Sequence, residues 1–179
     1  TLDGVEHKLD EEMELVTDTA GPLSLAGVMG GEESEVHSKT ENVLLEGASW
    51  NFINIRKTVS QLKINSEAAY RFSRGIHPAL AETGVRLCLK RMAEWGGGEV
   101  SAGLVDEYPA PPVEPVVKLS TAWVNESLGT DLGAEEIAEI LCRLEFDCEV
   151  DGDVITAKTP PHRLDIHDGI IGRADLLEE

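Results

Sequence analysis

The sequence predicts an α+β fold in two domains, residues 1–110 and 114–179. Short apolar runs bounded by Gly, Pro and polar residues mix with amphipathic segments without strict alternation, which is typical of that class. Four prolines stand within "EYPAPPVEP", residues 107–115, and proline at that density interrupts helices and central strands. Hydrophobic residues make up 41% of the 179 residues, and aromatic residues only 4%, so aliphatic side chains must build the cores.

In the first domain, "LSLAGVM", "NVLLEGASW" and "GEVSAGLVDEY" are apolar runs that predict strands. "NIRKTVSQLKI" predicts a short helix. "HPALAETGVRLCLKRMAEWGGG" predicts a longer helix with Pro78 at its first position and a glycine stop. Its apolar side chains trace one face, formed by Leu80, Leu87, Met92 and Trp95.

The second domain is predicted as two helices and a hairpin, an order that is winged-helix-like. "STAWVNESLG" offers Ser120 or Thr121 as the N-cap and ends at Gly129. "AEEIAEILCRLEF" places apolar residues on one face, and "DCEVDGDVITAKT" predicts two strands around an Asp-Gly turn. The second helix begins with glutamates, whereas a DNA-reading helix needs cations. A packing module is therefore favoured over a DNA-binding one.

Charge and cysteine content restrict the function classes. The net charge is −19, with 10 basic and 18 acidic residues in the first 111 positions and 5 and 16 in the rest. Such a field repels phosphate backbones, so neither half is predicted to be a basic binding module. No apolar run is long enough to predict a membrane span, and the start does not resemble a secretory signal. Three unpatterned cysteines predict free thiols in a reducing cytoplasm.

The glycine-rich stretch "LAGVMGG", residues 25–31, is the first candidate site. It lacks the Lys-Ser/Thr of a phosphate loop and the spacing of a dinucleotide fingerprint, so phosphate binding is disfavoured. Two interpretations remain open from the residues: glycines that permit close packing, or glycines whose backbone lines a narrow pocket.

Two further segments carry polar candidates. Glu46 ends an apolar run, and it is either exposed or a pocket acid that accepts a hydrogen bond from a ligand hydroxyl. Ser66 has no neighbouring histidine to activate it, and Arg71 and Arg74 are expected to pair with the many acids rather than with phosphate.

The acidic end "RLDIHDGIIGRADLLEE" is the last candidate. If "ADLLEE" begins a helix, Asp175 lies near its N-cap and Glu178 and Glu179 follow one turn later, with Asp165 or Asp168 arriving from the preceding loop. An all-oxygen cluster suits Mg²⁺ or Ca²⁺. The alternative is an acidic first turn favoured by the helix dipole.

Together, "LAGVMGG", "NVLLEGASW", "NSEAAYRFSRGIHP", "GGGEV" and "TPPHRLDIH…ADLLEE" occur in an order that resembles the beta subunit of bacterial phenylalanine–tRNA ligase, over essentially all 179 residues. The resemblance implies that residues 1–110 are the C-terminal part of the tRNA-editing domain and 114–179 the small domain after it. Editing hydrolyses tyrosine mistakenly attached to the phenylalanine tRNA, which the synthetic pocket cannot strongly exclude.

The resemblance also implies site residues. Glu46 would recognise the tyrosine hydroxyl, Gly27 and Gly30 would form one pocket wall, and Ser66 and Ala68 the other. Ser66 stands where the family often has threonine, a mild change. Other editing residues of the family precede Thr1, so no catalytic residue is assigned within this chain, and the chain alone is expected not to edit.

A magnesium ion is implied as well, held by Asp165, Asp175, Glu178 and Glu179. The loop between Asp165 and Asp175 is about four residues longer than is common, so Asp165 departs from the family's spacing to the other three ligands. ATP is used by the whole enzyme and is not expected to bind here. The implied partners are the alpha subunit, in a heterotetramer of two alpha and two beta subunits, and the phenylalanine tRNA. The competing hypotheses are a stand-alone amino-acid or tRNA binding module and a DNA-binding winged-helix protein.

Overall fold

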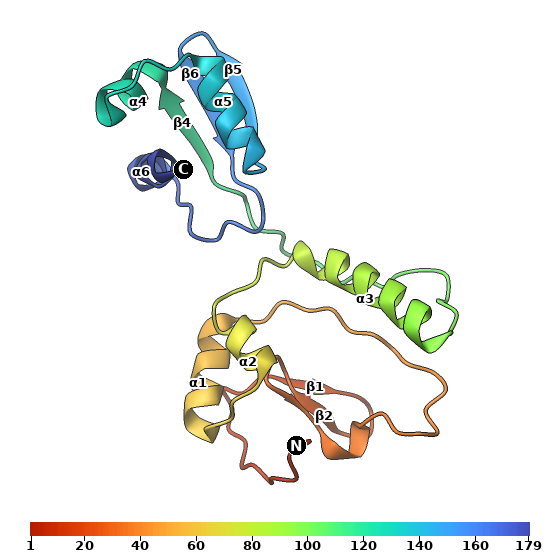
Figure 1. Cartoon of the computed structure of the whole chain (residues 1–179). Helices are drawn as coiled ribbons and strands as arrows, with labels where there is room; N and C mark the ends of the chain where they lie inside the picture. Colours follow the sequence, from red (N-terminus) through yellow and green to blue (C-terminus); the bar gives the residue numbers. More distant parts are fainter. The chain divides into compact units, whose positions relative to one another are not determined.

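The computed structural model describes residues 1–179 and divides the chain into two compact units, Thr1–Asp106 and Glu107–Glu179. Each unit mixes helices with a three-stranded antiparallel sheet (Figure 1), as expected of the α+β class. The second unit begins at the proline-rich segment. No helix combines the length and the hydrophobicity that crossing a membrane requires.

The sheet of the first unit has the order β1-β2-β3 and is formed by β1 (Leu15–Thr17), β2 (Pro22–Leu25) and β3 (Met29–Gly30). The predicted strand "LSLAGVM" is therefore divided in two. Residues 26–28 turn the chain back, so that Leu25 pairs with Met29 and Ser24 with Gly30. A 3₁₀ turn, η1 (Glu32–Ser34), follows the sheet.

Three helices complete the first unit: α1 (Phe52–Leu62), α2 (Glu67–Phe72) and α3 (Leu80–Gly96). The Asn51 side chain caps α1 by accepting a hydrogen bond from the Ile53 N–H. Gly97, with φ of +69°, ends α3 as the glycine run predicted, although the helix begins two residues after Pro78. The core lies between the sheet and the first two helices, and its buried members are Leu25, Val28, Ile55, Ile64 and Ala69.

Two predicted strands of this unit are absent. "NVLLEGASW" and "GEVSAGLVDEY" form no strand, because no strand pairs with either segment, and Leu44 and Val105 are 98% and 91% exposed. At Gly47 the first of these segments instead lies against α3, so closely that a Cβ would clash with Val85. The predicted apolar face of α3 is also largely exposed, with Trp95 at 80%, and Val85 is the buried residue of this helix.

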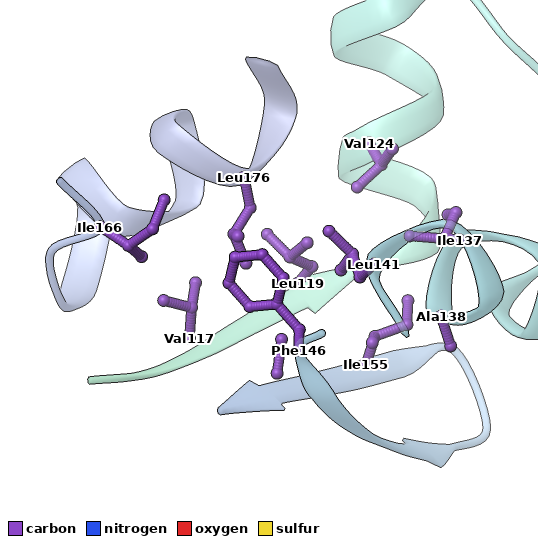
Figure 2. Close-up of a cluster of buried hydrophobic side chains, with 11 residues drawn as sticks. Val117, Leu119, Val124, Ile137, Ala138, Leu141, Phe146, Ile155, Ile166 and Leu176 are labelled. Atoms are coloured by element: carbon purple, nitrogen blue, oxygen red, sulfur yellow. The ribbon is translucent and has the colours of Figure 1, made fainter. Parts of the chain in front are cut away.

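The second unit has the element order β4 (Val116–Ser120), α4 (Thr121–Leu128), α5 (Ala134–Arg143), β5 (Asp147–Asp151), β6 (Val154–Lys158) and α6 (Gly169–Glu178). β6 is central, pairing antiparallel with both β4 and β5. Figure 2 shows the core, in which side chains from the sheet meet those of the helices around Leu119, Leu141, Phe146, Ile155 and Leu176. Ile155 is fully buried.

The helix–helix–hairpin prediction is confirmed for residues 120–158. The Ser120 hydroxyl caps α4 by accepting from the Trp123 N–H, Gly129 ends this helix with φ of +70°, and Gly152 forms the hairpin turn with φ of +59°. The sequence did not reveal β4, which adds the third strand. It also misplaced the start of the last helix, which begins at Gly169 rather than near Ala174.

Candidate functional site

A shallow pocket of about 660 Å³, wide open to solvent, lies on the first unit, where the β2–β3 turn meets the N-terminus of α2. Its lining is mostly apolar or backbone and comes from three separate stretches of the chain: Leu2, Asp3, Ser24, Leu25, Gly27, Val28, Met29, Gly30, Ser66 and Ala68. Four of the five predicted pocket residues, Gly27, Gly30, Ser66 and Ala68, are thus brought together.

The two predicted wall glycines line the pocket and also permit close packing. The two interpretations of "LAGVMGG", a packed turn and a pocket wall, are therefore compatible. Gly27 has φ of +65°, a conformation that side chains disfavour. A Cβ there would lie 2.5 Å from Cδ1 of Trp50 and 2.9 Å from Cδ1 of Ile55. At Gly30, a Cβ would lie 3.0 Å from Cδ1 of Leu2. Gly27 therefore lets the turn lie directly on the core, and Gly30 leaves room for Leu2 beside the pocket.

Ser66 joins the two walls of the pocket. Its hydroxyl donates to the Val28 carbonyl at 2.6 Å and accepts from the Ala69 N–H at 3.0 Å, which caps α2. The hydroxyl proton is thus committed to the backbone of the opposite wall, and no base contacts it. Ser66 is a structural tie between the glycine turn and α2 rather than a nucleophile.

Glu46, the fifth predicted pocket residue, lies outside this lining. It is exposed, within the irregular segment between η1 and α1. The structure does not bring its carboxylate to the pocket formed by the other four residues.

Sequence reasoning missed Leu2 and Asp3, which complete the lining. Asp3 is the single ionisable residue among the ten. Its Oδ1 accepts from the Thr1 hydroxyl at 2.5 Å and from the Val5 N–H at 3.1 Å, and these two hydrogen bonds lower the pKa of the Asp3 carboxyl. The pair "DG" at 3–4, with Gly4 at φ of +71°, signalled a tight turn but not its place beside the pocket.

The acidic end of the chain holds an arginine among its carboxylates. Arg163 donates through Nε and Nη2 to both oxygens of Asp165, at 2.9 and 2.6 Å, and through Nη2 to Oε1 of Glu179 at 2.5 Å. The guanidinium lowers the pKa of the Asp165 carboxyl to about 2, and the two carboxylates raise the pKa of Arg163.

Asp175 lies apart from this group. Because α6 begins at Gly169, Asp175 falls within the helix and not at its N-cap, where Asp168 stands instead. The Asp175 carboxylate accepts from the His167 N–H at 3.0 Å and lies 3.1 Å from Nδ1 of the same histidine. Glu178 and Glu179 end the helix.

The four predicted metal ligands therefore do not form an open oxygen cluster in this arrangement. No group of three or more His, Cys, Asp or Glu side chains in the chain is placed to hold a metal ion. Asp165 and Glu179 converge, but the Arg163 cation occupies the space between them, so the residues as arranged do not fit a magnesium ion.

Comparisons with known proteins match each of the two units to a domain family. A family model described as "B3/4 domain" matches residues 1–97, and one described as "tRNA synthetase B5 domain" matches residues 117–179. The chain is 38% identical over 179 residues to the phenylalanine–tRNA ligase beta subunit of Lactococcus lactis, covering 100% of this chain and 22% of that protein. It is 39% identical over 183 residues to the subunit of the same name from Moorella thermoacetica, with the same coverage. The chain thus spans about a fifth of the length of these curated relatives.

Proposed function

Because the chain belongs to the B3/4 domain family, we propose that it is part of a phenylalanine–tRNA ligase beta subunit and contributes to hydrolysis of mischarged tyrosyl-tRNA. The observation that supports this most directly is the pocket. Gly27, Gly30, Ser66 and Ala68, assigned by resemblance to two opposite walls, line one open pocket in the first unit.

The walls suit an amino-acid side chain. Most of the lining is apolar or backbone, as expected for an aromatic ring, and Gly27 and Gly30 leave the backbone accessible at the surface of the turn. Ser66 has committed its proton to Val28, so the ester would be attacked by water and not by a side chain of this pocket. The chain's part in the reaction is to bind and position the aminoacyl group.

Recognition of the tyrosine hydroxyl by Glu46 belongs to the proposal. A carboxylate that accepts this hydrogen bond would favour tyrosine over phenylalanine, since phenylalanine leaves the carboxylate unpaired in the pocket. In the structure Glu46 is exposed, so this role requires the segment between η1 and α1 to bring the carboxylate to the pocket.

The remaining assignments concern the whole enzyme. The proposed partners are an alpha subunit, in an assembly of two alpha and two beta subunits, and the phenylalanine tRNA. ATP and Mg²⁺ would serve the ligase reaction in the cytoplasm, with ATP bound outside this chain. A magnesium ion held by Asp165, Asp175, Glu178 and Glu179 would require Arg163 to leave the two carboxylates that it contacts.

The test uses the polypeptide extended on its N-terminal side to match its relatives. We expect this longer protein to deacylate tyrosyl-tRNA, the present chain alone not to do so, and Glu46→Ala to remove the preference for tyrosyl-tRNA over phenylalanyl-tRNA by about tenfold or more. Glu41→Ala, on the same irregular segment, is the matched control. If the longer protein never deacylates tyrosyl-tRNA, the pocket has been wrongly assigned.

A further inference from the structure

Two of the three cysteines lie on neighbouring elements of the second unit. Cys142 is in the last turn of α5, and Cys148 is the second residue of β5. Helix α5 packs on this strand and on β6. The third cysteine, Cys88, is exposed on α3 in the first unit. The two cysteines of the second unit are therefore the candidates for a joint site.

A tight helix end holds β5 against α5. Leu144 is the C-cap of α5, and Glu145 follows it in the left-handed region, with φ of +70°. The Phe146 N–H donates to the Leu141 carbonyl at 3.2 Å, and the Glu145 N–H donates to the Cys142 carbonyl at 3.0 Å. These are the two hydrogen bonds of a Schellman motif, which reverses the chain directly after a helix. Leu141 and Phe146 both belong to the core in Figure 2, so packing also fixes the reversal.

The side chain of Cys148 lies on the face of the sheet that α5 covers. Cys148 pairs with Ala157 on the central strand, and directly opposed residues of antiparallel strands share one face. Ala157 is fully buried, and Cys148 packs against the same core, to which α5 contributes Ala138 and Leu141. Cys142 follows Leu141 and lies one turn after Ala138, at the exposed edge of that helix face. Cys148 therefore points toward the helix end that carries Cys142.

The titration of Cys148 shows the same proximity. Burial, the charge of Cys142 and a hydrogen bond with the Cys142 side chain raise the pKa of the Cys148 thiol to about 12. A hydrogen bond between two side chains requires their sulfur atoms to be near neighbours. The two thiols differ in access, since Cys142 is exposed and Cys148 is half-buried. A reagent in solution thus meets Cys142 first, with Cys148 directly behind it.

We propose that Cys142 and Cys148 form a dithiol site that reacts with a small disulfide, such as glutathione disulfide, and closes into an intramolecular disulfide bond. First, the Cys142 thiolate attacks one sulfur of glutathione disulfide, which forms a mixed disulfide and releases one glutathione thiolate. Cys148 then attacks the Cys142 sulfur, the bond to glutathione breaks, and the Cys148 proton passes to the departing thiolate. The two cysteines are oxidised, and glutathione disulfide is reduced to two molecules of glutathione. Excess glutathione reverses both steps.

The bond links the end of α5 to an edge strand of the sheet. It lies in the second unit, so this inference goes beyond the editing role proposed for the first. Because a reducing cytoplasm keeps most thiols reduced, the site would close only as the share of glutathione disulfide rises. If the two cysteines only filled space as small apolar side chains, this bond would have no preference over other thiol reactions.

The test incubates the whole chain in buffers of about 1 mM glutathione with a rising share of its disulfide, blocks free thiols with iodoacetamide and maps the peptides by mass spectrometry. We expect the wild type to yield a cross-linked peptide pair that joins Cys142 to Cys148, with the loss of two hydrogen atoms. In Cys148→Ser the reaction should stop with one glutathione on Cys142. Because closure is intramolecular, the pair should oxidise at a disulfide share at least about tenfold lower than the share that modifies Cys88.

The matched control is Cys88→Ser, which removes an exposed cysteine from the other unit and should leave the bond between Cys142 and Cys148 unchanged. Circular dichroism verifies folding, and if Cys148→Ser is unfolded, the peptide map of the wild type decides alone. The proposal would be overturned by wild-type protein that carries glutathione on Cys142 without the cross-link, or by oxidation of the pair only at the share that modifies Cys88. None of these readouts measures hydrolysis of tyrosyl-tRNA, so failure of the editing assignment leaves the dithiol site intact.

Discussion

Gly27 shows how a single residue can serve packing and a site together. Its positive φ turns the chain between β2 and β3, and the space where a side chain would start is filled by Trp50 and Ile55. The pocket wall is therefore also part of the core. A change at this residue should affect folding before it affects binding.

Gly27→Ala should lower the free energy of unfolding by about 1–3 kcal/mol, because the new methyl group combines an unfavourable φ with a clash against Trp50. Urea denaturation measures the change. Gly84→Ala is the control, since Gly84 lies within α3 with open space around its Cα, and alanine there should stabilise by up to about 1 kcal/mol. Equal effects of the two substitutions would contradict this account of Gly27.

At the scale of elements, local chemistry predicted helix ends and turns well. Ser120, Gly129 and Gly152 act through their own backbone neighbours, so their roles could be read from the sequence alone. The segment at 42–50 failed because an apolar run does not specify a partner. Its glycine lies against α3, and no strand is available to pair with it.

The candidate site also combines residues that the sequence could identify with an arrangement that it could not. Gly27, Gly30, Ser66 and Ala68 were identified by resemblance, but their meeting in one pocket depends on contacts between distant segments. Asp3 reaches that pocket only through the tertiary fold. At the acidic end the start of the last helix was misplaced, because α6 begins at Gly169, and this moves Asp175 into the helix. The metal site stays a prediction, and in the structure Arg163 pairs with two of its expected ligands, Asp165 and Glu179.

The contact of Arg163 with Asp165 and Glu179 links the loop before α6 to the end of that helix. The contribution of this contact to stability should depend on pH. The pKa of Asp165 is lowered to about 2 from 3.8, so this contact stabilises the fold above about pH 4 and the contribution is lost as the pH falls towards 2. Asp165 is 64% exposed, so Asp165→Asn should cost less than about 1 kcal/mol at pH 6 and a smaller amount at pH 2, where the carboxyl group is about half protonated in the folded protein. Urea denaturation of both proteins at the two pH values measures this, and a difference that grows in acid would refute it.

At the scale of the whole molecule, charge is the dominant property. There are 34 acidic and 15 basic residues, and both units carry an excess of acid. Each unit has its own core and its own sheet, so the acidic surface is not offset by one large hydrophobic interior.

The repulsion between the acids should make stability depend on salt. Raising sodium chloride from 0.01 to 0.1 M shortens the screening length from about 30 to about 10 Å. The melting temperature should rise by about 2–5 °C, measured by circular dichroism. Sucrose at equal osmolality is the control for general solute effects. A falling melting temperature would show that attractive pairs such as Arg86–Glu82 and Arg143–Glu139 outweigh the repulsion.

The three tryptophans give the molecule its own optical reporters. Trp50 packs on the core beneath Gly27, at the back of the pocket wall. Trp123 belongs to the second unit, where the Arg173 guanidinium lies 4.1 Å from its ring centre, and Trp95 is exposed on α3. With Trp95 and Trp123 replaced by phenylalanine, emission from Trp50 would follow the pocket wall and the first unit. With Trp95 and Trp50 replaced instead, emission from Trp123 would follow the second unit. Ligand entry and the separate unfolding of each unit can thus be watched without any attached dye.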